Sequence, residues 1–173
     1  MMQLRAATVA DAEQLARIRV RAWQVGYRHV FPAEALAAMP VDARRWVESL
    51  THGFEGGQTC VVAEDERGVL GWATFGSARD PEDRYGEVRG LYVDPDRWGL
   101  GAGRALLARA ESELARGWDE AVLWTPADNP RTRRFYEANG WRADGVTSVF
   151  ESLGVEAAIV HYAKRLSSAA SRS

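Results

Sequence analysis

A strand, a glycine-rich turn and the start of a helix follow one another within residues 87–107, and this order constrains the fold more than any other feature. The segment reads Glu-Val-Arg-Gly-Leu-Tyr-Val-Asp-Pro-Asp-Arg-Trp-Gly-Leu-Gly-Ala-Gly-Arg-Ala-Leu-Leu. A helix that begins after such a turn leaves its first backbone N–H groups unpaired and carries partial positive charge at that end. Phosphate groups bind there readily, and Gly99, Gly101 and Gly103 let a ligand approach the backbone closely.

Two common nucleotide-binding motifs do not fit this turn. The pattern G-x-G-x-x-G needs a third glycine where this sequence has Arg104 or, in the next register, Leu106. A P-loop ends in Lys followed by Ser or Thr, and the only lysine of the chain is Lys164. Glycines after a strand also form ordinary turns, so the turn alone does not identify a ligand.

The same segment resembles the glycine motif of the GNAT superfamily of N-acetyltransferases, which bind acetyl-coenzyme A. The family pattern is Gln or Arg, two residues, Gly, one residue, then Gly or Ala. Aligned on Gly101 and Gly103, its first position is Trp98, which departs from the pattern. A second element of the family follows at 129–141, Asn-Pro-Arg-Thr-Arg-Arg-Phe-Tyr-Glu-Ala-Asn-Gly-Trp. Two elements at this separation are more specific than either one alone.

Hydrophobic spacing and turn residues predict the order strand, two helices, three strands, helix, strand, helix and two strands. This order matches the GNAT fold. The resemblance implies an α/β (α+β) domain with a mixed, mostly antiparallel sheet of about seven strands, flanked by about four helices. Its central strands splay apart, and coenzyme A lies between them. We expect one domain over residues 1–166 and a disordered tail over 167–173. Expected strands cover residues 2–7, 59–63, 69–75, 85–93 and 120–124, with a last hairpin around 153–154.

Local signals make sharper predictions. Thr8 and Asp11 fit a capping box, and the helix that follows them either ends or kinks at Gly26 or continues through residues 27–30. Asn129 is a natural N-cap, and Gly140 a natural stop. The apolar stripe of the first helix is expected to bury Ala12, Leu15, Ile18, Ala22 and Val25. Strand alternation predicts that the following side chains lie on one face: Glu87, Arg89, Leu91 and Val93.

Composition excludes some function classes. The formal net charge of −2 gives no reason to expect a nucleic-acid or membrane-surface partner. Cys60 is the only cysteine, so no intrachain disulfide forms. The N-terminus has no apolar signal core, and no apolar run is long enough to span a membrane. The three histidines have no metal-ligand spacing, so we assign no metal. We expect a soluble, cytoplasmic protein.

The resemblance implies that acetyl-CoA is the co-substrate and that it lies along the strand and the turn. Backbone groups of Leu91, Tyr92 and Val93 would contact the pantetheine arm and polarise the thioester. Asn129 and Tyr136 would complete the contacts to that arm. Arg97, Arg104 and Arg131 are candidates for additional charge against the phosphates. The amides expected to hold the pyrophosphate belong to Trp98, Gly99, Leu100, Gly101, Ala102, Gly103 and Arg104.

Two residues are candidates for acid–base catalysis. Tyr136 matches the tyrosine of the family, and a phenol with a pKa near 10 can protonate a departing thiolate. Glu87 lies four residues before Leu91, where some GNAT enzymes carry a catalytic glutamate. It is our candidate for the general base and for contact with the acceptor. The alternative, which the sequence leaves open, is a structural carboxylate paired with Arg89 or another arginine.

The sequence defines the site of the acceptor amine less closely than the site of the cofactor. Trp23 and Tyr27 lie four residues apart where related proteins wall the acceptor pocket, and a core stripe is the alternative for both. Asp80, Glu82 and Asp83 lie in an acidic loop that could attract a cationic amine, and a solvated surface loop is the alternative. The function that these observations favour is acetyl transfer to a primary amine of a small molecule or a protein, by direct attack in a ternary complex. The alternative is a non-catalytic acyl-CoA-binding module. The sequence leaves open whether the chain forms a homodimer.

Overall fold

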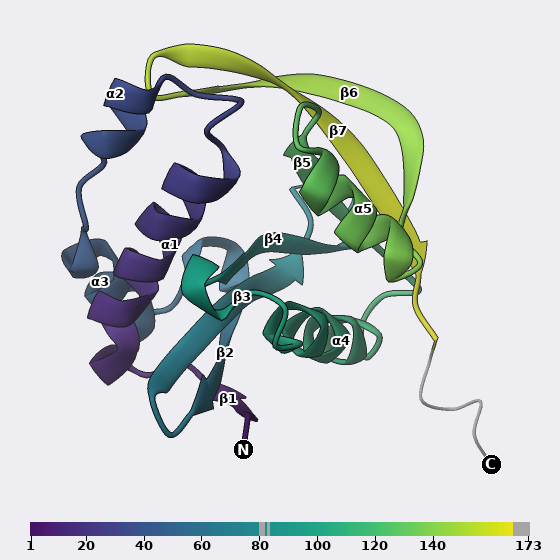
Figure 1. The fold of residues 1–173 in the computed structure, drawn as a ribbon. Helices are drawn as coiled ribbons and strands as arrows, with labels where there is room; N and C mark the ends of the chain where they lie inside the picture. The colour runs from purple at the N-terminus through teal and green to yellow at the C-terminus, as the bar shows by residue number, and fades with distance from the viewer. Residues whose placement is uncertain (80–81, 83, 168–173) are drawn as a thin grey trace.

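The computed structural model describes residues 1–79, 82 and 84–167, and its centre is a seven-stranded sheet with the order β1-β2-β3-β4-β5-β7-β6 (Figure 1). All neighbouring strands are antiparallel except β4 and β5, which are parallel. The predicted mixed, mostly antiparallel sheet is therefore confirmed. The strands are β1 (Gln3–Ala6), β2 (Thr59–Asp65), β3 (Gly68–Ser77), β4 (Gly86–Val93), β5 (Glu120–Pro126), β6 (Arg142–Ser152) and β7 (Val155–Arg165).

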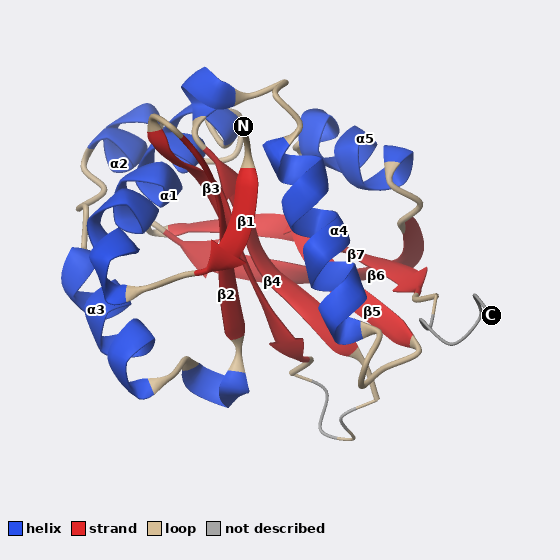
Figure 2. Ribbon diagram, turned by 90° about the horizontal axis from the view of Figure 1, so that it is seen from below, coloured by secondary structure: helices blue, strands red, loops and turns tan. Residues whose placement is uncertain are grey.

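Helices cover both faces of the sheet (Figure 2). One face packs against α1 and α3, with α2 beside them, and the other packs against α4 and α5. The apolar stripe of α4, at helical spacing, is fully buried and joins the larger core cluster; its residues are Leu106, Leu107, Ala110 and Leu114. The tip of the β6–β7 hairpin reaches over to α2 (Figure 1). The helices are α1 (Ala12–Gly26), α2 (Ala33–Ala37), α3 (Ala43–His52), α4 (Ala102–Leu114) and α5 (Pro130–Ala138).

The central strands separate early, and this separation creates the site. β4 and β5 pair only at Gly86 with Ala121 and at Glu87 with Val122. Beyond these pairs, β5 keeps β7 as its partner over its whole length, whereas the β5-facing edge of β4 has no strand beside it. The predicted splay of the central strands is confirmed, and it leaves backbone N–H and C=O groups of β4 available to a ligand.

A β-bulge interrupts β4. Thr74 of β3 pairs with Gly90, and the next residue, Phe75, pairs with Val88, so Arg89 has no partner on β3. An extra residue of this kind locally reverses the alternation of side chains along a strand. Arg89 is therefore the residue at which β4 changes register.

The bulge overturns the predicted alternation along β4. Val88, Leu91 and Val93 all belong to the core cluster beneath α4, whereas Tyr92 packs in the cluster beneath α1 and α3. The prediction that Glu87 shares a face with Leu91 and Val93 is wrong, because it assumed an unbroken period of two. Glu87 instead lies on the face that carries Tyr92.

Most of the helix caps and helix ends that local sequence signals predict are present in the structure. Asp11 accepts a hydrogen bond from the Thr8 backbone N–H, and α1 ends at Gly26, which is one of the expected alternatives. Asn129 caps α5, and Gly140 has a φ of 85° just beyond it. Val25, however, is 39% exposed, so its predicted burial is wrong. At about 100° per residue, it lies roughly 130° around the helix from the centre of the buried side of α1.

Two predictions fall partly outside the described residues. Asp80 and Asp83 of the acidic loop are not among them. The expected tail over 167–173 is described only at Ser167. Just before it, the Leu166 backbone N–H donates a hydrogen bond to the carbonyl oxygen of Asp119, at 2.8 Å. The extent of the domain and of its tail therefore stays a prediction.

Candidate active site

A cavity of about 470 Å³ lies where β4 and β5 separate, between the C-terminal end of α1, the glycine turn and the N-terminal half of α5. Most residues that the sequence predicts for the site line this cavity, whereas Glu87, Leu100 and Trp23 do not. The residues that line it are Tyr27, Leu91, Tyr92, Val93, Trp98, Gly99, Gly101, Ala102, Gly103, Arg104, Asn129 and Tyr136.

The glycine turn has the backbone geometry that the sequence suggests. Gly99 and Gly101 have φ values of 82° and 86°, in the left-handed region where a side chain is strained. Gly101 is the N-cap of α4 and provides no side chain to bond the first amides of the helix. These amides are therefore available to an anion. The Leu100 side chain is 61% exposed, so only its backbone can contribute to binding.

Two of the three candidate arginines face the cavity without a carboxylate partner among the described residues. Arg97 forms a close ion pair with Asp65, which neutralises it. The Arg131 guanidinium stacks over the Trp98 ring, 3.5 Å from its centroid. Trp98 is itself fixed, because its Nε1 donates to the Val93 carbonyl oxygen at 2.9 Å. Burial alone lowers the pKa of Arg131, and Arg104 lies on the same wall.

Two uncharged side chains on the cavity wall each have a buried polar atom without a hydrogen-bond partner. Asn129 accepts a hydrogen bond from the Thr132 backbone N–H through Oδ1, at 3.3 Å, but its Nδ2 is unpaired. The hydroxyl of Thr125 on β5 is also buried and unpaired. Sequence reasoning missed Thr125, although a single polar residue within the apolar run Ala-Val-Leu-Trp-Thr-Pro is a usable signal. Together the two groups fit a ligand that carries amide or carbonyl groups.

Tyr136 lies in α5, beside the cavity, and is 7% exposed. Its ring contacts Phe135, Trp141 and Tyr162. Burial, and then the neighbouring Tyr92 phenol, raise the pKa of the Tyr136 hydroxyl above its ordinary value. The hydroxyl therefore keeps its proton at neutral pH, as a proton donor must.

Glu87 is buried, at 4% exposure, but it lies outside the cavity wall. Its Oε2 accepts a hydrogen bond from the Arg79 backbone N–H at 3.1 Å and lies 3.7 Å from the Arg89 Nε. These contacts fit the structural carboxylate that the sequence left open. Its role as a base stays a prediction, and any proton transfer to it from the cavity would pass through water or another group.

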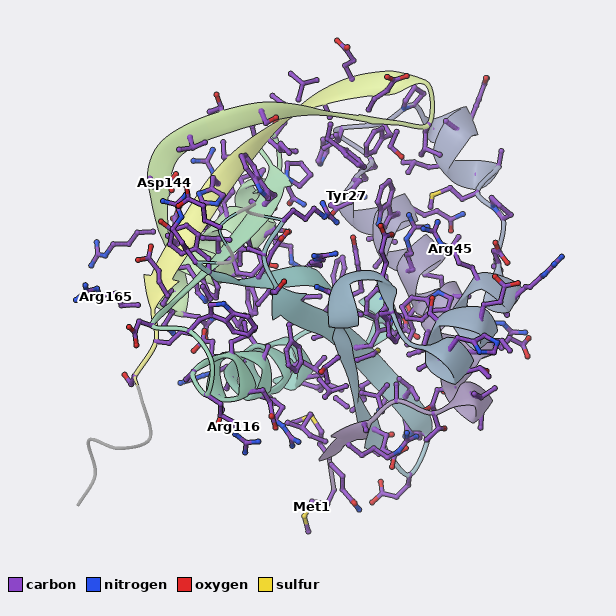
Figure 3. The ribbon with its side chains drawn as sticks, turned by 180° about the vertical axis from the view of Figure 1, so that it is seen from behind. Met1, Tyr27, Arg45, Arg116, Asp144 and Arg165 are labelled. Atoms are coloured by element: carbon purple, nitrogen blue, oxygen red, sulfur yellow. The ribbon has the colours of Figure 1, made fainter. Side chains whose placement is uncertain are left out.

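The aromatic residues after and within α1 separate into two layers. Tyr27 lines the cavity and lies between α1 and the β6–β7 hairpin (Figure 3). Trp23 is buried behind it, with ring centroids 4.9 Å from Tyr27 and 5.4 Å from Phe31. The three rings meet although α1 ends at Gly26. The structure therefore places Trp23 in the core and Tyr27 on the wall.

Among the described residues, no helix is both long and apolar enough to cross a membrane. In the same part of the chain, no cluster of three or more His, Cys, Asp or Glu side chains could hold a metal ion. The chemistry of the cavity wall thus comes from backbone amides, arginines, hydroxyls and one asparagine.

Comparison with known proteins gives concordant results. The model of the acetyltransferase (GNAT) family matches residues 13–141. The uncharacterized N-acetyltransferase YuaI of Bacillus subtilis is 32% identical over 143 residues, which are 80% of this chain and 79% of the relative. Rv2775 of Mycobacterium tuberculosis, described as a probable N-acetyltransferase, is 27% identical over 164 residues, which cover 93% of this chain and 92% of the relative.

Solved structures share the fold. PaiA N-acetyltransferase from Thermoplasma acidophilum, in complex with coenzyme A, superimposes with a TM-score of 0.76 at 16% identity, covering 95% of this chain and 99% of that one. YncA from Salmonella typhimurium, with its cofactor acetyl-CoA, gives a TM-score of 0.74 at 22% identity, covering 99% and 98%. At these identities the likeness concerns the fold.

Proposed function

Because this chain belongs to the acetyltransferase (GNAT) family and is an acetyl-CoA-dependent N-acetyltransferase, we propose that it acetylates a primary amine by direct attack within a ternary complex. The observation that carries the proposal is a cavity that joins the glycine turn to the open edge of β4. It provides one continuous wall for the phosphates, the pantetheine arm and the thioester. Family membership favours this enzyme over a non-catalytic acyl-CoA-binding module.

The pyrophosphate binds at the start of α4. The first amides of α4 have no partner within the helix, and the turn before it is built with left-handed glycines. Arg131 supplies positive charge from α5, because stacking on Trp98 holds its guanidinium at the cavity wall. Trp98 thus takes the place of the polar motif residue indirectly, by positioning a cation from another helix.

The pantetheine arm runs along the open edge of β4. Its amide groups pair with backbone groups of β4 and with the unpaired Asn129 Nδ2 and Thr125 hydroxyl. A backbone N–H of β4 near Leu91 or Val93 polarises the thioester carbonyl. One preorganised donor of this kind lowers the barrier by about 3–4 kcal/mol.

The transfer forms one C–N bond and breaks one C–S bond. The neutral amine attacks the thioester carbonyl, and the tetrahedral oxyanion is held by the β4 donor. Tyr136 protonates the departing thiolate, for which its raised pKa keeps the proton available. The proton lost by the amine passes through water toward Glu87, which lies on the opposite side of β4 from α4.

The test is release of free thiol from acetyl-CoA across a panel of amines, with mass spectrometry of the products. We expect an acetylated amine and one released thiol for each transfer. Tyr136→Phe should retain acetyl-CoA binding and lose most of the turnover. Absence of both acetyl-CoA binding and acetylated product in the wild-type protein would refute the proposal.

A further inference from the structure

Trp124 is the one exposed tryptophan of the seven in the chain, and it lies on the wall of the cavity. It belongs to β5, where its neighbours Leu123 and Thr125 are buried, yet its own side chain is 36% exposed. A large aromatic side chain that stays open inside a cavity is typical of sites that bind apolar or aromatic groups. The proposed function uses backbone amides, a phenol and polar side chains, so it does not account for this ring.

Trp124 lies on the α1 side of the sheet. β4 and β5 pair at Glu87 and Val122, so these two side chains share a face. Trp124 follows Val122 by two residues, and β5 pairs with β7 without interruption, so Trp124 lies on the same face. This is also the face that carries Tyr92. The ring is therefore placed toward α1 and away from α4 and its glycine turn.

Two residues of the β6–β7 hairpin hold the Trp124 ring in position. His161 pairs directly with Trp124 across β5 and β7, and the two ring centroids are 4.6 Å apart. The His161 Nδ1 in turn lies 2.6 Å from the Asp144 Oδ2. A ring that its neighbours already hold loses little freedom when a ligand packs against it.

We call the part of the cavity wall on the α1 side of the sheet the acceptor end. Its one charged side chain among the described residues is Arg89, whose Nε lies 3.7 Å from a Glu87 oxygen and whose Nη2 donates to the Ser77 carbonyl oxygen. Burial, and then the neighbouring Tyr92 phenol, raise the pKa of the Tyr27 hydroxyl, which is therefore uncharged at neutral pH. The residues of the acceptor end are Ala22, Gly26, Tyr27, Arg89, Tyr92 and Trp124.

This composition excludes some acceptors. A polyamine carries a second ammonium group, which would find no carboxylate on the described wall and would be repelled by Arg89. An aminosugar would bury several hydroxyl groups against aromatic rings without partners. An amine attached to a flat apolar group instead packs its ring on Trp124 and leaves no second polar group to satisfy.

We propose that Trp124 determines the specificity for the acceptor, and that the acceptor is an arylalkylamine, a primary amine on a short alkyl chain that ends in an aromatic ring. The ring packs on Trp124, and the amine reaches the open edge of β4, where the proposed function places the thioester. This inference rests on the proposed function and names the acceptor class for the same site. It makes polyamines, aminosugars and the lysine side chains of proteins poorer acceptors.

The experiment compares 2-phenylethylamine with 2-cyclohexylethylamine, which has the same carbon skeleton but no flat ring. It also includes 1,4-diaminobutane and a lysine-containing peptide. Thiol release and product mass give kcat/KM for each amine. We expect 2-phenylethylamine to exceed 2-cyclohexylethylamine by about fivefold, the usual effect of an aromatic pair beyond burial. It should exceed the diamine and the peptide by at least about tenfold, because a ring is buried.

Variants separate recognition from folding. Trp124→Leu keeps an apolar side chain and removes the ring, so it should abolish the preference for 2-phenylethylamine over 2-cyclohexylethylamine and leave the KM for acetyl-CoA within about threefold. Phe150→Leu is the matched control, because Phe150 is 37% exposed but does not line the cavity, and it should leave the preference unchanged. His161→Leu loosens the Trp124 ring and should reduce the preference by less than Trp124→Leu does. If Trp124→Leu does not fold, by thermal unfolding and acetyl-CoA binding, the wild-type preference and His161→Leu still decide the question.

The possible outcomes are distinct. Equal or better turnover of 2-cyclohexylethylamine, of 1,4-diaminobutane or of the peptide overturns the arylalkylamine acceptor and leaves the proposed function standing. A preference that Trp124→Leu and His161→Leu leave unchanged overturns Trp124 as its cause. Failure to acetylate any amine contradicts the proposed function itself.

Discussion

The two ends of the cavity are built in different ways. At the glycine-turn end, one continuous segment from β4 to α4 provides backbone amides, and Arg131 adds a side chain from α5. At the acceptor end, the wall combines the side chains of Tyr27, which follows α1, and Arg89, which lies in β4, so it is built from separate parts of the chain. A site formed by backbone amides tolerates a changed side chain, such as Trp98 at the first position of the glycine motif. Binding by dispersed side chains depends on each one.

The largest effect is expected from a change of backbone at the glycine-turn end. Gly101→Val places a β-branched residue at a φ of 86° and moves the first amides of α4, so acetyl-CoA binding should weaken by about 100-fold or more. Calorimetric titration with acetyl-CoA measures this loss of affinity. Gly117→Val is the matched control, because Gly117 has open space around it and no positive φ. Equal losses in both variants would show that the turn has no special role.

Tyr136→Phe tests the chemistry that lies between the two ends. The general acid is lost while the ring and its aromatic contacts remain, so kcat should fall by about 100-fold and the Kd for acetyl-CoA should stay within about threefold. The wild-type rate should hold as pH rises toward 10, because the raised pKa keeps the phenol protonated. Steady-state kinetics from pH 6 to 10 check this. An unchanged kcat would remove Tyr136 from the mechanism.

The Arg131→Met variant tests how much a side chain, in addition to the backbone amides, contributes to phosphate binding at the glycine-turn end. Loss of this cation should raise the KM for acetyl-CoA by about tenfold, and acetyl-pantetheine, which has no phosphates, should be used as before. Trp98→Ala should produce a smaller effect of the same kind, because Arg131 loses its stacking partner. Arg109→Met, on the outer side of α4 and paired with Glu113, is the control. Equal effects on both thioesters would exclude a phosphate contact.

The elements at the glycine-turn end could be predicted because their signals are local. The α4 stripe, the Asn129 cap and the positive φ of Gly140 each depend on residues within a few positions. The splay of β4 and β5 could not be derived from periodicity and came from the family resemblance. The sequence also could not show Arg131 stacked on Trp98, because the two lie on different elements.

The acceptor end resisted prediction for a physical reason. The bulge at Arg89 follows from how β3 and β4 pair, and neither strand alone carries a signal for it. That single extra residue decided the face on which Glu87 lies. The predicted burial of Val25 is wrong for a simpler reason, because the apolar spacing continues beyond the buried side of α1.

Substitution of Asp11, which lies outside both ends of the cavity, is expected to have the smallest effect on ligand binding. Its carboxylate accepts hydrogen bonds from Arg5 and from the Thr8 N–H, so Asp11→Asn should reduce the free energy of unfolding by about 2 kcal/mol at pH 7. The substitution should leave acetyl-CoA binding unchanged. Arg17→Gln, at an exposed ion pair with Glu13, is the control and should cost less than about 0.5 kcal/mol.

The effect of Asp11 should also depend on pH with a definite sign. Hydrogen bonds from Arg5, and then from Thr8, lower the pKa of the Asp11 carboxyl in the folded protein. A depressed pKa stabilises the fold above the unfolded value of about 3.9, and this stabilisation is lost as pH falls through the native pKa. The difference between wild type and Asp11→Asn should therefore be constant from pH 8 to 5 and shrink below about pH 4, as measured by urea unfolding. If the difference in unfolding free energy instead grows on acidification, Asp11 is held protonated in the folded protein. If Asp11→Asn changes the affinity for acetyl-CoA, the scaffold and the two ends of the cavity are coupled.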